Sequence, residues 1–203
     1  MTPRQAHAPS LALDNVAVIR GNRLVFSGFS LAAGAGDIVW IRGANGSGKS
    51  TLLRLIASLL PKASGEMRID GAIALADENL ALDANMTVEK ALRFWADMDG
   101  TTSAALEAAL KATDITMLAD IPVRFLSTGQ RKRASLARVL ASSAPIWLLD
   151  EPYNGLDSAS AARLDTALLK HAAMGGIALV AAHQAPPVNV AQSILLDRKV
   201  APA

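Results

Sequence analysis

The chain contains the segment Gly43-Ala44-Asn45-Gly46-Ser47-Gly48-Lys49-Ser50-Thr51, which matches the pattern G-x-x-x-x-G-K-[S/T]. The residues before it, 37–42, predict a buried strand, and the residues after it, 51–57, predict a helix. Glycines let successive backbone N–H groups turn toward one phosphate, and the helix start adds the positive end of its dipole. The strand, loop and helix therefore predict a phosphate-binding loop.

Two side chains of this loop have distinct expected roles. Lys49 would place its charge on the β- and γ-phosphates of a nucleotide, and the Ser50 hydroxyl would bind Mg²⁺. The whole segment from Gly43 to Thr51 is the candidate nucleotide-binding site.

Composition narrows the class of protein. The 203 residues are 51% hydrophobic and 19% charged, which predicts a globular chain with a well-buried core. The net charge of +2 gives no argument for a nucleic-acid partner, and the basic cluster at residues 131–133 is interpreted as a solvated helix face. Cysteine is absent, which excludes disulfides and thiolate metal sites. No apolar run reaches about 18 residues and the N-terminus has no signal-like core, so another chain is expected to supply any membrane channel.

The order of predicted elements indicates an α/β fold. Strands are expected at residues 11–19, 24–31, 37–42, 66–70, 72–76, 146–150, 177–182 and 193–197, with a turn at 64–66. The helix after the loop is expected to end near Pro61, and Thr87 is expected to cap the next helix. Residues 81–140 are interpreted as a helical insertion, and a further helix is expected from 158. Antiparallel strands ahead of a strand–loop–helix unit indicate a mixed sheet.

Two carboxylates, Asp150 and Glu151, follow an apolar strand that begins at Ile146. In phosphate-loop proteins a carboxylate at such a strand end holds Mg²⁺, and a second one can polarise an attacking water. Neighbouring residues on a strand point to opposite faces, so both roles require the strand to end there. The following Pro152 agrees with that ending.

The segment Leu126-Ser127-Thr128-Gly129-Gln130 precedes a predicted helix over residues 131–141. By itself it is compatible with an ordinary helix cap. Beside a phosphate loop it predicts a second anion site, for which one nucleotide has little use. The simplest geometry is two copies facing each other, each completing the other's site.

His183 comes directly after the apolar strand at 177–182. A lone histidine is often structural. At the carboxyl end of a parallel strand beside a phosphate site, it can donate a hydrogen bond to the γ-phosphate.

These motifs, in this order, resemble those of the ATP-binding cassette (ABC) ATPases. The loop at 43–50 resembles Walker A, residues 126–130 resemble the LSGGQ signature with Thr128 in place of a glycine, and 146–151 resemble Walker B with its catalytic glutamate. Residues Gly155-Leu156-Asp157 resemble the D-loop and His183 the switch histidine. A narrower resemblance, carried by residues 24–30, 52–55, 120–123 and 175–184, is to the haem-exporter ATPases of bacterial cytochrome c maturation.

The resemblance implies a mechanism and its partners. It implies one ABC domain over 1–203, with a RecA-like core at about 11–80 and 141–203 and a helical subdomain at about 81–140. Two copies would sandwich ATP, with Ser127, Gly129 and Gln130 of one copy facing the Lys49 loop of the other. Glu151 and His183 would be catalytic, and Asp150 with Ser50 would hold Mg²⁺. The partners implied are integral membrane subunits at the cytoplasmic face of the inner membrane, in a complex that delivers haem to a periplasmic chaperone.

Two positions depart from the ABC pattern. Arg20 stands where an aromatic residue usually stacks on adenine, and Asn79 stands where a glutamine usually contacts metal and water. A guanidinium can stack on a base, and asparagine carries the same amide on a shorter stem. Asn79 is therefore a candidate metal contact, and slow hydrolysis by the isolated subunit is expected.

Two other functions are compatible with these motifs. One is the ATPase subunit of another ABC exporter, for lipids or drugs, because the cassette never touches the transported ligand. The other is an ABC ATPase that acts on nucleic acid or ribosomes. Those proteins usually carry two cassettes or a long coiled-coil insertion, neither of which this chain has.

Overall fold

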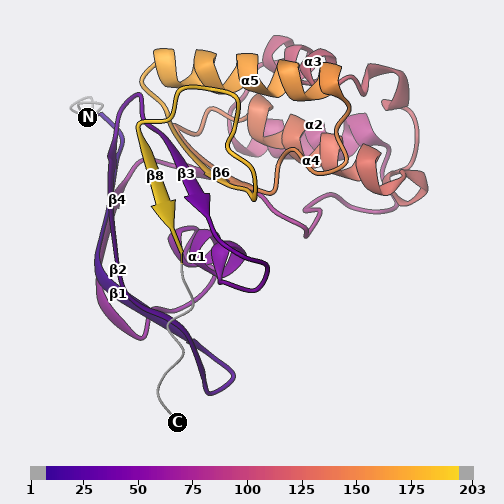
Figure 1. The fold of residues 1–203 in the computed structure, drawn as a ribbon. Helices are drawn as coiled ribbons and strands as arrows, with labels where there is room; N and C mark the ends of the chain where they lie inside the picture. Colours follow the sequence, from indigo (N-terminus) through magenta and orange to yellow (C-terminus); the bar gives the residue numbers. More distant parts are fainter. Residues whose placement is uncertain (1–7, 197–203) are drawn as a thin grey trace, which may run out of the picture.

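The computed structural model describes residues 8–196, which form two sheets with helices packed around them (Figure 1). The strands are β1 (Ser10–Arg20), β2 (Arg23–Gly34), β3 (Ile38–Arg42), β4 (Ser64–Asp70), β5 (Ile73–Ala76), β6 (Ile146–Asp150), β7 (Ile177–Ala181) and β8 (Gln192–Leu195). The helices are α1 (Lys49–Ile56), α2 (Val88–Met98), α3 (Ser103–Ala112), α4 (Thr128–Ala141) and α5 (Ser158–Ala173), with short 3-10 turns η1 (Thr116–Leu118) and η2 (Val123–Phe125).

The first sheet is antiparallel, with strand order β2-β1-β4. Its β1–β2 hairpin closes through Gly21 and Asn22, whose φ angles of 54° and 58° are the positive values that a tight two-residue hairpin turn requires. The turn signal in the sequence lies at the same residues. This hairpin places Arg20 and Arg23 opposite each other at the tip of the sheet.

The second sheet is parallel, with order β5-β6-β7-β3-β8. Its central strands β6 and β7 are buried along their whole length, as their unbroken apolar sequences predict. Because parallel strands all end at the same edge, the residues that follow β3, β6 and β7 come together there. The antiparallel and parallel strands expected from the sequence thus divide between two sheets.

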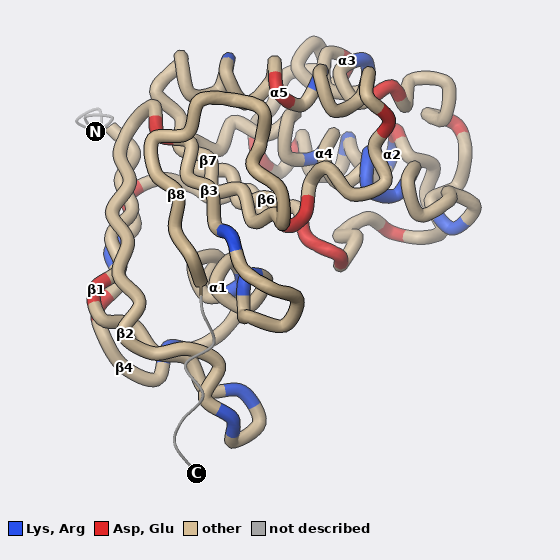
Figure 2. The backbone as a smooth tube through the Cα atoms, viewed as in Figure 1, with Lys and Arg blue, Asp and Glu red and all other residues tan. Residues whose placement is uncertain are grey.

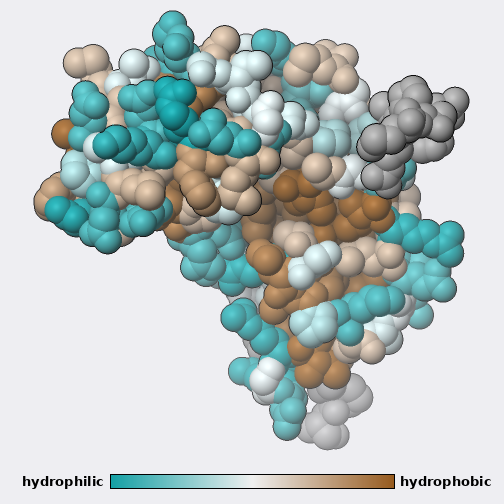
Figure 3. Space-filling view, turned by 180° about the vertical axis from the view of Figure 1, so that it is seen from behind, coloured by the Kyte–Doolittle hydropathy of each residue, from teal (hydrophilic) through white to brown (hydrophobic). Residues whose placement is uncertain are grey.

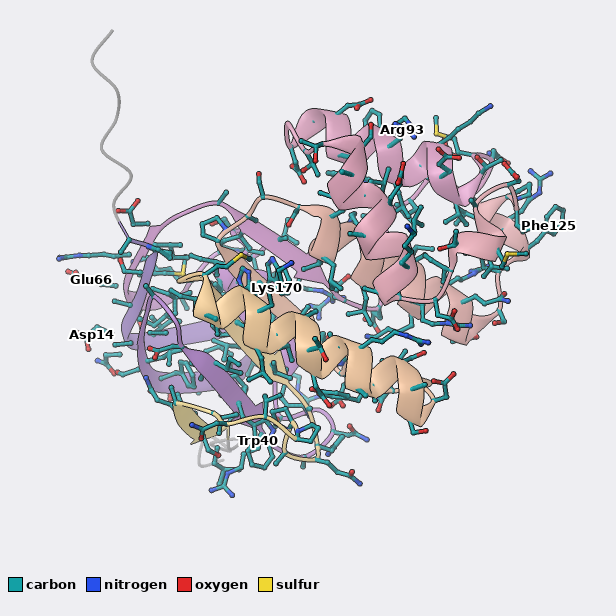
Figure 4. The ribbon with its side chains drawn as sticks, turned by 90° about the horizontal axis from the view of Figure 1, so that it is seen from above. Asp14, Trp40, Glu66, Arg93, Phe125 and Lys170 are labelled. Atoms are coloured by element: carbon teal, nitrogen blue, oxygen red, sulfur yellow. The ribbon has the colours of Figure 1, made fainter. Side chains whose placement is uncertain are left out.

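Three groups of buried side chains hold the elements together. One lies between the two sheets and α1, and another packs α4 and α5 on the opposite face of the parallel sheet. The third lies within residues 82–141 and joins α2, α3 and α4. Figure 4 shows α5, with Lys170 labelled, alongside these helices. α4 therefore contacts both the helical part and the sheet.

Several predicted boundaries differ from the structure; β2, for example, runs from Arg23 to Gly34 and not over 24–31. α1 ends at Ile56, several residues before Pro61, because Ser58 adopts a left-handed φ of 60° that interrupts the helix. β4 starts at Ser64, inside the expected turn, and α4 starts at Thr128, inside the Ser127–Gln130 motif. The predicted cap at Thr87 is confirmed, since its side chain accepts a hydrogen bond from the Lys90 amide. The expected end of the last strand at Asp197 lies outside the described residues.

His171 on α5 gives a prediction for acid stability. Its ring stacks on Trp147 with centroids 3.8 Å apart, and burial lowers the pKa of His171 below 6.5. Below about pH 6.5 the unfolded chain therefore binds a proton at this histidine more readily than the folded chain does. The contribution of neutral His171 to the free energy of unfolding is thus fully present above about pH 6.5 and decreases as the pH falls below that value. We expect urea unfolding to show a larger loss of stability from pH 7.5 to 5.5 for the wild type than for His171→Gln. Equal losses, or an NMR titration of His171 near its ordinary pKa, would contradict this account.

Candidate functional site

The loop between β3 and α1 has a backbone that only its glycines permit. A Cβ on Gly43 would lie 2.5 Å from the Ser47 hydroxyl oxygen and 2.6 Å from the Leu196 carbonyl oxygen. Gly48 occupies the N-cap of α1 with a φ of 107° and no side-chain cap. The first N–H groups of α1 are therefore left for a ligand, which is the arrangement that binds phosphate.

Lys49 bends back across this loop. Its side chain is 6% exposed, and its Nζ donates to the Gly43 carbonyl at 2.9 Å. The same Nζ lies 3.3 Å from Glu151 Oε1. The lysine of the loop and the glutamate after β6 thus form one charged pair in the floor of the site.

The backbone at Asp150 and Glu151 lets one carboxylate hold a metal ion and the other polarise a water. Asp150 is the last residue of β6, and Glu151 has a left-handed φ of 46° while its N–H donates to the Ala181 carbonyl at 2.7 Å. The strand ends between them, so the two carboxylates are not forced to opposite faces. Acidic residues gather at this end of β6 in Figure 2.

The surroundings of Asp150 suit a bound cation. Burial raises the pKa of Asp150, while a hydrogen bond from Ser50 and the charge of Lys132 oppose that rise. Asp150 Oδ1 is buried and has no hydrogen-bond partner among the described residues. A buried acceptor oxygen beside a serine hydroxyl fits Mg²⁺, which takes oxygen ligands and keeps several waters.

His183 reaches the same place from the end of β7. Its Nε2 lies 2.5 Å from Asn45 Oδ1 and 3.7 Å from Glu151 Oε1. Its side chain is 44% exposed, so it stands at the open side of the site. The structure therefore brings together the predicted residues of the phosphate loop, the end of β6 and the end of β7.

A cavity of about 350 Å³ lies above these residues. Arg20 and Arg23 from the β1–β2 hairpin form one wall, together with Leu24 and Val25. The sequence predicts that Arg20 occupies the base-stacking position, and in the structure Arg20 lines this cavity. The remaining lining residues are Ala44, Asn45, Gly46, Gly48, Lys49, Ser50, Thr51, Asp150 and Glu151.

The signature residues lie outside that cavity. Ser127 is the N-cap of α4, and Ser127 and Gln130 form a capping box in which each side chain accepts the other's backbone N–H. Gly129 lies against the D-loop, since a Cβ there would be 3.3 Å from the Gly155 carbonyl oxygen. Asp157 caps α5 through the Ser160 amide at 2.7 Å, and this bond lowers the pKa of Asp157. The start of α4 thus lies against the D-loop that leads into α5, and neither lines the cavity of the Lys49 loop.

Comparison with known proteins agrees with this geometry. The family model described as ABC transporter matches residues 26–154. A putative ABC transporter ATP-binding protein from Pyrococcus furiosus superposes with a TM-score of 0.78 at 23% identity, covering 92% of this chain and 97% of that one. A bacterial ABC exporter solved with ATP bound gives a TM-score of 0.83 at 24% identity, over 95% of this chain and 38% of the other. These two likenesses establish the fold.

Curated relatives define the family more narrowly. The cytochrome c biogenesis ATP-binding export protein CcmA of Sphingopyxis alaskensis is 53% identical over 85% of this chain and 89% of the relative. The CcmA protein of Zymomonas mobilis is 50% identical over 94% of this chain and 86% of the relative. The chain belongs to the CcmA family of ABC transporter ATP-binding proteins.

Membership of the CcmA family confirms the fold and the activity expected from the motifs. The chain is an ABC-type phosphate-loop ATPase that binds nucleotide, and its hydrolysis of ATP to ADP and phosphate is coupled to transport. Such a subunit works with membrane subunits and with a second ATPase domain. Among residues 8–196, none of the helices combines the length and apolar character that crossing a bilayer requires.

Asn79, which the sequence predicts as a candidate metal contact, does not line the cavity of the Lys49 loop. Asn79 is exposed and lines a separate cavity of about 490 Å³. Its backbone N–H donates to Asp77 Oδ1, and Asp77 Oδ2 accepts from Arg54 Nε on α1, each at 2.9 Å. Arg54 also reaches Glu78 at 3.1 Å. Sequence reasoning missed this network because its partners are 23 and 24 residues apart, with no motif that links them.

The Arg54–Asp77 pair should stabilise the fold. Both side chains are largely buried, at 13% and 7% exposed, so removing one leaves the other charge without its partner. We expect Arg54→Met to lower the free energy of unfolding by about 3 kcal/mol. Glu78 is 76% exposed, and Glu78→Gln should cost less than about 1 kcal/mol. Urea unfolding measures the free energy of unfolding of both variants. Equal losses would show that the cost of removing a charge from this network does not depend on how deeply its side chain is buried.

Proposed function

We propose that the chain is the ATPase of a membrane complex that exports or delivers haem to a periplasmic haem chaperone for cytochrome c biogenesis. The observation that carries the proposal is the 53% identity to a CcmA protein. The cavity lined by the Lys49 loop and by Asp150 and Glu151 at the end of β6 supports it. The chain would lie at the cytoplasmic face of the inner membrane as a peripheral subunit.

The proposed site residues act on the terminal phosphate of ATP. N–H groups of residues 43–51 and the Lys49 ammonium bind the β- and γ-phosphates. Ser50 and Asp150 would hold Mg²⁺, which supplies positive charge against the phosphate oxygens when bound. His183 donates to the γ-phosphate as it is transferred, and Glu151 takes a proton from the attacking water.

The Lys49–Glu151 contact suggests how ATP prepares this site. Nζ of Lys49 lies 3.3 Å from Glu151 Oε1, so its positive charge opposes the negative charge of the proposed base. A γ-phosphate carries more charge than one carboxylate and competes for the same ammonium. Release of Glu151 from this pair leaves its carboxylate free to accept a proton from water.

The signature residues are proposed to act on the other copy's ATP. Ser127, Gly129 and Gln130 stand at the start of α4, outside the cavity that Lys49 lines. In a sandwich of two copies they would complete the partner's site, with Asp157 of the neighbouring D-loop at the contact. In this arrangement residues 1–203 act as one ABC domain, in which the helical subdomain at about 81–140 moves relative to the core.

The membrane subunit is proposed to dock next to the helical part. Figure 3 shows hydrophobic surface gathered on the back of the molecule, below the helices. The cavity that contains Asn79 is lined also by Leu59, which is 64% exposed, and by Trp95. Charged side chains of Arg54, Asp77 and Arg138 line the same cavity, so the proposed partner segment would present both apolar and polar groups.

Complementation tests the haem proposal. In a strain lacking its own copy, the wild-type chain should restore covalently haem-stained c-type cytochromes, and Glu151→Gln should not. Restoration by Glu151→Gln would mean that ATP hydrolysis at this site is not needed. Normal cytochromes in the deletion strain would overturn the haem proposal and leave the ATPase intact, with another exporter as the alternative.

A further inference from the structure

Lys132 reaches the catalytic strand from the signature helix. It lies in the second turn of α4, and its Nζ donates to the main-chain carbonyl of Asp150 at 2.5 Å. Burial lowers the pKa of Lys132, although the nearby charges of Asp150 and Glu151 favour the ammonium. None of the phosphate-binding or catalytic roles above uses this side chain.

The carbonyl that Lys132 binds belongs to the peptide that joins Asp150 to Glu151. Glu151 has a φ of 46°, a left-handed conformation that a residue with a side chain adopts at a cost of about 1 kcal/mol or more. Such a conformation persists only where its surroundings hold it. Here the Glu151 N–H is held by Ala181 of β7 at 2.7 Å, and the preceding carbonyl is held by Lys132.

α4 connects this contact of Lys132 with the signature residue Ser127. The helix starts at the Ser127 cap, only five residues before Lys132, and both belong to one continuous run of helical hydrogen bonds. A shift or rotation of the helix start therefore moves Lys132 with it. In the proposed sandwich, Ser127 contacts the ATP that is bound by the other copy.

We infer that Lys132 is a positioning residue that links the two ATP sites. Through it, engagement of Ser127 with the partner's ATP sets the position of the Asp150–Glu151 peptide in the same chain. This inference rests on the proposed roles of Ser127 and Glu151. The alternative is that Lys132 only satisfies a buried carbonyl and contributes to folding.

Three variants of the full chain separate these roles. Lys132→Met removes the donor and keeps an unbranched stem, Lys132→Arg keeps a donor, and Lys90→Met repeats the change at an exposed lysine of α2. We expect Lys132→Met to lower kcat about tenfold or more with little change in the KM for ATP, because small displacements of a catalytic group are costly. Lys132→Arg should recover most of the rate, and Lys90→Met should match the wild type.

Amide hydrogen exchange gives a readout that does not depend on turnover. In nucleotide-free protein, Lys132→Met should speed exchange of the Glu151 N–H by about tenfold, while the amides of β3 stay unchanged. Faster exchange throughout the sheet, together with a lower melting temperature, would indicate a folding role and overturn the inference. So would a kcat for Lys132→Met equal to that of the wild type.

A double variant tests the link to the signature. If Lys132 transmits the state of Ser127, then Ser127→Ala combined with Lys132→Met should be no slower than the slower single variant. Multiplied losses would show that the two residues act independently and would contradict the inference. If instead the wild type hydrolyses no ATP under any condition, the proposed function fails and not only this link.

Discussion

Replacing Glu151 by glutamine should lower ATP turnover by about 10²- to 10⁴-fold, the range lost with a general base. The amide has nearly the same shape but cannot accept a proton from water. Its neutral group also removes the negative partner 3.3 Å from the Lys49 ammonium, so ATP no longer competes with a carboxylate for that lysine. We therefore expect ATP affinity to be kept or increased while hydrolysis is lost.

Phosphate release and binding of a fluorescent ATP analogue measure the two effects separately. Glu107→Gln, at an exposed position of α3, is the matched control and should behave as the wild type. The closed pair of subunits should accumulate with ATP in Glu151→Gln and appear as a dimer by light scattering. Turnover within twofold of the wild type would mean that another group activates the water.

Lys49→Met should lower ATP affinity by about 10- to 100-fold, because a hydrogen bond to a charged group contributes about 1.5–3 kcal/mol. Turnover should fall further, since the same ammonium faces the charge that develops on the γ-phosphate. Lys49 is 6% exposed and holds the Gly43 carbonyl, so the variant must be shown to fold.

Thermal unfolding without nucleotide provides that control for Lys49→Met. A melting temperature near that of the wild type, together with weak binding, supports the phosphate role. Lys111→Met, at an exposed position near the end of α3, should change neither property. Unchanged ATP affinity in a folded Lys49→Met protein would show that the backbone N–H groups alone bind the phosphates.

The phosphate site could be predicted because its residues are close in sequence or end apolar strands. Residues 43–51 form a contiguous loop, and Asp150 and His183 follow the unbroken apolar runs of β6 and β7. Parallel pairing then brings those strand ends to one edge of the sheet. The motif order was enough to indicate the ABC family, which the comparisons confirm.

Other features depend on long-range geometry that spacing does not encode. The Arg54–Asp77 pair and the Lys132 contact to Asp150 join residues 23 and 18 positions apart, through side chains with no motif of their own. The sequence predicts a solvated helix face at residues 131–133, yet Lys132 is half-buried and its Nζ donates to the Asp150 carbonyl of β6. The end of α1 also differs from its prediction, because Ser58 adopts a left-handed conformation and stops the helix several residues before Pro61.

Identification of the membrane partners tests the central claim most directly. A tagged Glu151→Gln chain would be expressed in its own host and held with ATP, and the membranes would be solubilised gently. Mass spectrometry would then identify the proteins that co-purify, with Lys49→Met, which is expected to bind ATP weakly, as the control. We predict recovery of the integral membrane subunits of cytochrome c maturation with Glu151→Gln and not with Lys49→Met. Recovery of an unrelated permease, or of proteins from outside the membrane alone, would contradict the account.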